Sequence, residues 1–368
     1  MVKQILQIIP TPPNSSDGIG DYALLLAIQL RQDFQVDTRF LVFRDDVPVE
    51  PTINGFASSR LPAHNPAAFC SSIPADTKVI IIHFSGYPYF HTNLKGAFGI
   101  GTPFWLIDAL RLVVKSHQLK LIVMFHELPK LHWQQFYVFE FLNPIHSIVS
   151  RRLARMADAV LTSSTNLQAI LSQWLGKDIT KISIFSGIGE PESVPPFGAR
   201  QPHLVIFGGS PRNRIYQNHF PALIQSCKLL GIEAIYDIGP PLKLPEDPSS
   251  EIELVAMGFL SQAEISQRLL TARIGCIDYT PFPGNLAKSS VFAAYCAHGL
   301  LPILTRYNPS EADGLHLDRH YLVLGNKLDD VNLDRAAAIA DRAHEWYQSH
   351  TIAEIAKTFF ACIANAIA

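Results

Sequence analysis

The sequence predicts an α/β protein made of two doubly wound domains in series, and three observations predict it. Short apolar runs alternate with amphipathic helical patterns along nearly all of its 368 residues, which indicates βαβ units around parallel sheets. That length exceeds the roughly 250–300 residues at which a single hydrophobic core stops growing. A stretch rich in proline and glycine interrupts the alternation at 190–202, and the alternation then restarts.

The first half of the chain carries the elements of one such domain. Apolar runs with few charges predict strands at 3–9, 36–43, 78–83, 119–125, 158–162 and 181–185. Runs of this kind are typical of parallel strands that are buried on both faces. Helical patterns between them predict helices at 21–32, 103–117, 144–156 and 166–175. Two of these helices begin with a proline, where a missing backbone N–H costs little.

The second half repeats the arrangement. Strands are predicted at 203–208, 232–238, 252–257, 274–279, 301–304 and 321–324. Helices are predicted at 216–230, 261–271, 287–298 and 333–347. We therefore expect a first domain over 1–190, a linker over 191–202 and a second domain over 203–350. The remaining residues, 351–368, place five large apolar side chains on one helical stripe, which must be buried against a partner surface.

Composition and charge exclude several classes of protein. Hydrophobic residues make up 48% of the chain and charged residues 17%, which suits two buried cores and argues against disorder. The formal net charge of −2 gives no basic field for a nucleic-acid backbone, so we expect no nucleic-acid partner.

Features of the chain also bear on its compartment. The first residues, MVKQILQIIPTPP, lack the apolar length of a signal peptide. No run approaches the roughly 20 apolar residues of a membrane span. The five cysteines are scattered, as expected for free thiols in a reducing compartment. We therefore expect a cytoplasmic protein with no integral membrane segment, at most peripheral to the inner face of the membrane.

In open parallel sheets ligands bind beyond the carboxyl ends of the strands, so residues after each strand are the first candidates. Gly18, Gly20 and Asp21 lie in the string SDGIGDYA, a glycine-rich turn at a helix start, where free N–H groups suit an anion or hydroxyl. The string also matches G-x-G-x-x-A, and Asp45 and Asp46 follow the next strand, which raises an NAD(P)-dependent oxidoreductase as an alternative. A proline-rich stretch at 10–17 separates the glycines from the first strand, which weakens that alternative.

Two further candidates follow strands of the first domain. His126 and Glu127 come directly after the strand predicted at 119–125. A histidine there can exchange a proton near neutral pH or donate a hydrogen bond to a sugar hydroxyl, although many such residues are structural. The loop at 83–105 is rich in glycine and aromatic residues, whose rings can stack on sugar faces.

Cationic side chains mark the second domain. Arg212 and Arg214 follow the paired glycines that end its first strand, and a planar guanidinium suits phosphate oxygens. Lys288, Ser289 and Ser290 lie near the start of an apolar helix. An ammonium, two hydroxyls and free helix N–H groups there suit a diphosphate, the alternative being a capped helix with a surface lysine.

These places, taken in order, resemble the retaining GT-B glycosyltransferases of the family-4 type over nearly the whole chain. The strings that carry the resemblance are DGIGDYALLLAIQL, VMFHELP, RRLARMADAVLTSS, VAMGFLSQAEISQRLLTARIGCIDYTPFPG and AAYCAHGLLPIL. The resemblance implies two Rossmann-like domains with an interdomain cleft. It also implies sugar transfer from a nucleotide-diphosphate-sugar donor to a glycan, lipid-linked or small-molecule acceptor, with retention.

The resemblance also implies residue roles. Arg212 or Arg214, together with Lys288, would neutralise the diphosphate, and the backbone near Gly258 and Phe259 would meet the nucleotide base. His126 would face the sugar, and the segment 351–368 would return to the first domain. No metal or other cofactor is implied, because protein cations and helix dipoles can take up the charge of the leaving group.

One departure separates this chain from the family pattern. Family-4 members commonly carry a Glu-x7-Glu pair at the last helix, and the matching positions here hold Leu286 and Ala294. Recognition of the ribose by the usual carboxylate therefore does not carry over. The departure leaves a non-catalytic binding protein of GT-B fold as an alternative to the enzyme.

Overall fold

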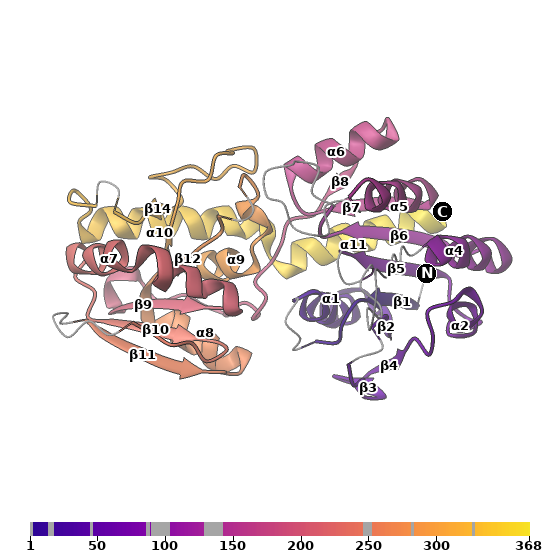
Figure 1. Ribbon diagram of the computed structural model, residues 1–368, viewed down its shortest axis with the longest axis horizontal. Helices are drawn as coiled ribbons and strands as arrows, with labels where there is room; N and C mark the ends of the chain where they lie inside the picture. Colours follow the sequence, from indigo (N-terminus) through magenta and orange to yellow (C-terminus); the bar gives the residue numbers. More distant parts are fainter. Residues whose placement is uncertain are drawn as a thin grey trace. The chain divides into compact units, whose positions relative to one another are not determined.

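The computed structural model describes residues 3–13, 18–44, 47–85, 89, 104–128, 143–245, 252–280, 283–325 and 328–368. Its elements form two compact units (Figure 1). Unit 1 comprises Met1–Ile182 and Ile355–Ala368, and unit 2 comprises Ser183–Glu354. Among the described residues, no helix is long and apolar enough to cross a membrane.

Unit 1 contains an eight-stranded sheet in the order β3-β4-β2-β1-β5-β6-β7-β8. The strands are β1 (Gln4–Ile9), β2 (Asp37–Val42), β3 (Thr52–Ile53), β4 (Phe56–Arg60), β5 (Val79–Phe84), β6 (Lys120–Phe125), β7 (Ala159–Thr162) and β8 (Thr180–Lys181). Its described helices are α1 (Ile19–Phe34), α2 (Pro66–Ser71), α4 (Phe104–His117), α5 (Asn143–Met156) and α6 (Thr165–Leu175). Every pairing is parallel except that of β3 with β4.

Alternate residues of the unit 1 strands face opposite layers of helices, as the pleat requires. Ile8 of β1 and Leu41 of β2 belong to the core that includes α4 and α5. Their neighbours Ile9 and Phe40 pack with α1 on the other face. Burial on both faces explains why these strands read as continuous apolar runs in the sequence.

Unit 2 contains a six-stranded sheet in the order β11-β10-β9-β12-β13-β14, parallel throughout. Its strands are β9 (Gln201–Phe207), β10 (Ala234–Ile238), β11 (Glu253–Gly258), β12 (Ala272–Ile277), β13 (Leu301–Leu304) and β14 (Leu322–Val323). Its α-helices are α7 (Asn213–Leu229), α8 (Gln262–Thr271), α9 (Ser290–Ala297) and α10 (Leu333–Tyr347). Numbered along the chain, this order is 3-2-1-4-5-6, that of a doubly wound Rossmann fold.

Both sheets therefore have a switch point, where the strand order reverses. It lies between β1 and β5 in unit 1 and between β9 and β12 in unit 2. In unit 2 the Tyr295 hydroxyl of α9 contacts both strands at this point, because it lies 3.1 Å from the carbonyl of Val205 in β9 and 3.0 Å from that of Cys276 in β12. The prediction of two doubly wound α/β domains is confirmed, and ligands are expected at the carboxyl ends of the strands beside each switch point.

The C-terminal helix, α11 (Ile352–Ile367), belongs to unit 1 from Ile355 onward. The middle of its apolar stripe is buried, at Ile355, Phe359 and Ile363, whereas Ile367 at its end is 42% exposed. The ring of Phe360 stacks on that of Phe34 at the end of α1, with centroids 4.2 Å apart. The central part of the stripe seen in the sequence is thus covered within unit 1.

Several elements differ from the sequence expectation. The short hairpin of β3 with β4 and the helix α2 carry no strong apolar period and were not expected. The strand expected at 181–185 is only two residues long, as β8. The helix expected from 287 begins at Ser290, because Leu286–Lys288 forms a 3₁₀ turn and Ser289 caps the helix.

The proline-rich segment expected as a linker is anchored within unit 2. The carboxylate of Glu190 accepts hydrogen bonds from the Tyr347 hydroxyl at 2.6 Å and from the backbone N–H of Ile352 at 2.8 Å. Arg200 donates to the carbonyls of Pro195 and Ala272. These polar anchors explain why the division between the units lies at Ile182 and not after 190.

Replacement of Glu190 by glutamine is expected to alter the pH dependence of stability. Burial raises the pKa of Glu190 above its ordinary value, against the opposing effect of its two hydrogen bonds. A raised pKa means that the ionised form is disfavoured in the folded state, so the wild type loses stability as pH rises through that pKa. Glu190→Gln removes this loss. The free energy of unfolding of the variant minus that of the wild type should therefore be larger at about pH 7 than at about pH 4.

Urea unfolding of both proteins at the two pH values measures this difference. Glu192→Gln, at an exposed position of the same segment, is the matched control. A difference between Glu190→Gln and wild type that is the same at both pH values would contradict the expectation.

Candidate functional site

Closely packed loops form the carboxyl edge of unit 2 at its switch point. β9 is followed by Gly208, whose φ of +128° is a conformation that side chains rarely allow. Gly239, after β10, has φ of +145°, and a Cβ there would overlap the carbonyl oxygen of Gly208. The backbones after β9 and β10 are therefore in direct contact, which requires a glycine at position 239.

Arg212 holds these loops in place. Its guanidinium donates to both carboxylate oxygens of Asp237, at 2.9 and 2.7 Å, and its other N–H groups point to backbone carbonyls after β9 and β10. Asp237 also accepts from the Tyr216 hydroxyl at 2.7 Å. Arg212 is only 6% exposed, and all its donors are used. These contacts contradict the prediction that Arg212 binds a diphosphate.

Two arginines of unit 2, Arg214 and Arg306, are exposed and come shortly after strand ends. Arg214 lies in the first turn of α7, two residues beyond Arg212. Arg306 lies two residues after the end of β13 and was not singled out in the sequence, although its position after a buried strand is the signal that identified the others. Within the described residues, neither guanidinium forms a hydrogen bond or ion pair. Both are therefore available to a ligand oxyanion.

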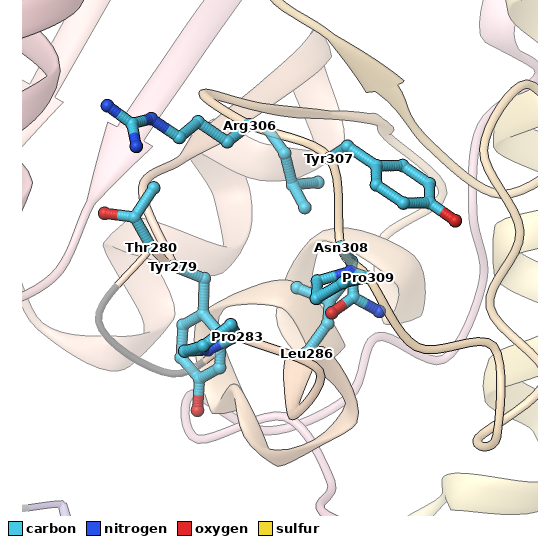
Figure 2. Close-up of a pocket in the computed structure, with 9 residues that line it drawn as sticks. Tyr279, Thr280, Pro283, Leu286, Arg306, Tyr307, Asn308 and Pro309 are labelled. Atoms are coloured by element: carbon cyan, nitrogen blue, oxygen red, sulfur yellow. The ribbon is translucent and has the colours of Figure 1, made fainter. Parts of the chain in front are cut away.

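Arg306 lines a pocket of about 180 Å³ at the ends of β12 and β13. The pocket is lined by Tyr279, Thr280, Pro283, Leu286, Leu304, Arg306, Tyr307, Asn308 and Pro309. Figure 2 shows the Arg306 side chain extending on the side of Thr280 and the Tyr307 ring turned away from it. The pocket thus combines a cation with hydroxyl, amide and aromatic groups, a set that suits a phosphorylated sugar.

Two side chains fix the walls of this pocket. The Asn308 amide accepts from the N–H of Gly284 at 3.0 Å and donates to the carbonyl of Ser310 at 2.7 Å. Asp278 accepts from the Thr305 hydroxyl at 2.7 Å and from the N–H of Thr280 at 3.2 Å. The loops after β12 and β13 are therefore bound to each other before any ligand arrives.

The start of α9 lies beside the same loops. Lys288 is half-buried at the end of the 3₁₀ turn, and Ser290 is the exposed first residue of the helix. The Ser289 hydroxyl oxygen is used as the helix cap, because it accepts from the N–H of Phe292 at 3.1 Å. The predicted diphosphate roles of Lys288, Ser289 and Ser290 remain predictions, with the oxygen of Ser289 already engaged in capping.

The positions of the absent Glu pair are part of the core. Leu286 is 1% exposed and Ala294 is fully buried. A carboxylate at either position would have to be desolvated. Leu286 and Ala294, which replace the Glu pair, are thus packed within the η4 turn (Leu286–Lys288) and α9, and neither replacement lies on the surface.

The residues predicted to meet the base lie at the end of β11. Gly258 has φ of +69° and accepts a hydrogen bond from the N–H of Gly239 at 2.8 Å. Phe259 is 75% exposed, an unusual setting for a large apolar ring. Its position at the carboxyl edge of the sheet suits stacking against a nucleotide base.

Unit 1 carries a buried polar cluster at its own carboxyl edge. His126 follows β6 and is 8% exposed, and its Nε2 lies 3.0 Å from Nδ1 of His83 in β5. His83 is buried, which lowers its pKa to about 3, and its Nε2 lies 2.6 Å from Oε1 of Gln7 in β1. Glu127 accepts from the Ser85 hydroxyl at 3.2 Å. Sequence reasoning included His83 only as the first residue of the loop at 83–105 and missed Gln7, although polar residues inside fully buried strands are a visible signal.

The glycine-rich turn has a packing role in part. Gly18 caps α1 with φ of +69° and is exposed, and Asp21 lies in the first turn of that helix. Gly20 is buried, and a Cβ there would overlap the backbone of Pro12 and Pro13. The room that Gly20 leaves is therefore filled by the chain itself and not by a pyrophosphate, which argues against the dinucleotide alternative.

Some candidates cannot be located. Asp45 and Asp46, and most of the aromatic loop at 83–105, lie outside the described residues. Among the residues that the structure does describe, no group of three or more His, Cys, Asp or Glu side chains is arranged to hold a metal ion.

Comparison with known proteins identifies the fold. No protein-family model matches the chain, and no curated protein sequence matches it. An alpha-glucosyltransferase (AGT) solved with UDP is 8% identical, with a TM-score of 0.60 over 98% of this chain and 99% of that chain. HepE from Anabaena, solved with UDP and glucose, is 12% identical, with a TM-score of 0.62 over 99% and 100% of the two chains.

Further solved structures extend the comparison. An alpha,alpha-trehalose 6-phosphate synthase from Burkholderia multivorans is 10% identical, with a TM-score of 0.57 over the full length of both chains. AGT has also been solved with UDP and a 13-mer DNA. At these low identities the likeness shows the fold, and the predicted GT-B architecture of two Rossmann-like domains is confirmed.

Proposed function

We propose that this chain is a glycosyltransferase that takes its sugar from a nucleotide-diphosphate donor. The observation that carries the proposal is the carboxyl edge of unit 2. There Arg214, Arg306 and the start of α9 follow strand ends at or near the switch point, beside a preformed pocket. Exposed arginines and helix N–H groups at such a position suit a diphosphate, whose charge grows as the sugar leaves.

The proposal assigns each part of the donor to a part of unit 2. Arg214, Arg306 and Lys288 take the diphosphate, and the pocket at Thr280 and Asn308 takes the sugar. The base stacks at Phe259. Solved structures of the same fold support the choice of donor, because AGT and HepE were each solved with UDP and HepE also with UDP-glucose.

In unit 1, the proposal makes His126 and Glu127 the catalytic residues, which exchange protons or form hydrogen bonds with sugar hydroxyls, and places Gly18 and Asp21 on the acceptor side. We assign no metal to the reaction, because arginine, lysine and helix N–H groups can offset the leaving-group charge. Transfer with retention is proposed from the family-4 resemblance.

The acceptor we propose is a glycan, a lipid-linked sugar or a small molecule. The structure of AGT with DNA means that the fold alone does not exclude a nucleic acid. The formal net charge of −2, however, provides no basic field for a polyanion. A gel-shift titration with duplex DNA tests this choice of acceptor, and tight binding of the DNA would contradict it.

Calorimetric titration with UDP, GDP, ADP and NAD tests the donor class. One nucleoside diphosphate should bind in the absence of metal, and NAD should not. With UDP-glucose as the probe, His126→Ala should reduce turnover by about 10²–10⁴-fold, while added EDTA leaves turnover unchanged. Binding of NAD alone, or of none of the four, would overturn the proposal.

Burial of Leu286 and Ala294 favours one second candidate, a GT-B protein that binds a nucleotide-sugar without turning it over. It shares the donor site and differs only in chemistry. Binding of UDP-glucose with no hydrolysis or transfer by the wild type, over hours and with varied acceptors, would favour it over the enzyme.

A further inference from the structure

We propose that His83 is a positioning residue that holds His126 in one tautomer, with the proton on Nε2 and the lone pair on Nδ1. The proposal rests on the proposed function only for the role of His126 in the reaction. The geometry that carries it is a chain of polar side chains through the sheet of unit 1. Gln7 of β1, His83 of β5 and His126 after β6 are linked in that order, and none of them is exposed.

The direction of this chain begins at Gln7. Its amide Nε2 lies 3.3 Å from the Thr38 hydroxyl, to which it donates, so its Oε1 faces His83. The distance of 2.6 Å from Oε1 to His83 Nε2 fits a short N–H···O bond and is too short for two nitrogens. An amide oxygen only accepts hydrogen bonds, so Nε2 of His83 must carry a hydrogen.

The second link follows from the charge of His83. The ring is fully buried among strands, and burial lowers its pKa to about 3, so it is neutral near neutral pH. A neutral imidazole carries one hydrogen, here on Nε2, which leaves a lone pair on Nδ1. The 3.0 Å contact to His126 is therefore a bond that His126 Nε2–H donates to His83 Nδ1.

The consequence concerns the hydrogen-bonding sense of the His126 ring. With Nε2 donating to His83, Nδ1 of a neutral His126 carries a lone pair and acts only as an acceptor. The Tyr22 ring contacts both imidazoles edge-on, with centroids 4.9 Å from His126 and 5.8 Å from His83, and restricts their rotation. The sense of hydrogen bonding at His126 is thus set by Gln7, two links deeper in the sheet.

The first test reads the tautomers directly and does not depend on activity. Long-range ¹H–¹⁵N spectra of the ¹⁵N-histidine-labelled full chain distinguish protonation on Nε2 from Nδ1. Signals are assigned by their loss in His83→Gln and His126→Asn. Both rings should be in the Nε2–H form near neutral pH. A His126 proton on Nδ1, or a charged His83, would overturn the proposal whether or not the chain transfers sugar.

The second test separates positioning from packing. Glutamine at 83 can still donate to Gln7 and accept from His126, whereas leucine can do neither. With UDP-glucose as the probe, His83→Leu should lower turnover by roughly 10–100-fold, as loss of an orienting partner does elsewhere. UDP affinity should stay unchanged, and His83→Gln should recover most of the turnover.

The outcomes are distinguishable. Equal losses in the folded leucine and glutamine variants, or full turnover in the leucine variant, would contradict a positioning role. If the leucine variant does not fold, the wild-type tautomer spectrum and the turnover of the glutamine variant still test the positioning role of His83. If the wild type binds no nucleotide and shows no turnover, the proposed function fails while the tautomer result stands.

Discussion

Arg212→Ala is expected to lower the free energy of unfolding by about 3–5 kcal/mol, the range for a buried ion pair that loses one partner. Among the described residues, the substitution would leave the carboxylate of Asp237, whose side chain is 3% exposed, with only the Tyr216 hydroxyl as a hydrogen-bond partner. It would also free the carbonyls after β9 and β10 that Arg212 now bonds. Arg212→Lys should have a free energy of unfolding between those of the wild type and Arg212→Ala, because one ammonium cannot reach all these acceptors.

Arg214→Ala is the matched control, since it removes an equal charge two residues away from an exposed position. Its effect on stability should stay within about 0.5 kcal/mol. Urea unfolding of the three variants and the wild type at one pH measures both quantities. Equal destabilisation by Arg212→Ala and Arg214→Ala would mean that the bonds of Arg212 do not hold the loops as described.

The combined change Arg214→Ala and Arg306→Ala is expected to weaken UDP binding by about 100-fold, with each single change costing about tenfold. A hydrogen bond to a charged group contributes about 1.5–3 kcal/mol, and 1.4 kcal/mol corresponds to a factor of ten. The two arginines follow different strands and share no partner among the described residues, so their effects should add.

Calorimetry with UDP gives these ratios. Arg319→Ala, an exposed cation of unit 2 that precedes the amino end of β14, is the control and should leave the affinity unchanged. Loss of affinity in the control equal to that of the single variants would indicate a general charge effect. Unchanged affinity in the double variant would remove both arginines from the donor site.

Much of the architecture could be predicted from the sequence, because burial on both faces leaves long apolar runs that hydrophobic patterning detects. α10 has the expected bounds, and all six strands of unit 2 lie within three residues of theirs. The hairpin of β3 and β4 could not be anticipated, because its strands are short and partly exposed. The division between the units at Ile182 could not be predicted from composition, which shows the prolines of the 190–202 segment but not the bonds that Glu190 and Arg200 make.

The site was harder to predict, because residue type does not show burial. Arg212 and Arg214 have the same chemistry and nearly the same place in the sequence. One lies inside the loop cluster with all donors used, and the other lies on the surface. Tertiary contacts alone separate them. Gln7 and His83, in contrast, were detectable as polar residues within buried strands, and Arg306 as a cation shortly after one.

Hydrogen exchange of the full chain with and without UDP tests the central claim most directly, since it reports where the nucleotide binds. Protection is expected in unit 2, at 207–214, 258–260, 284–292 and 304–309, where N–H groups lie at the carboxyl edge of the sheet. The turn at 18–21 of unit 1 should change little with UDP alone. Protection confined to 18–21, with none at the unit 2 segments, would contradict a donor site at the switch point of unit 2.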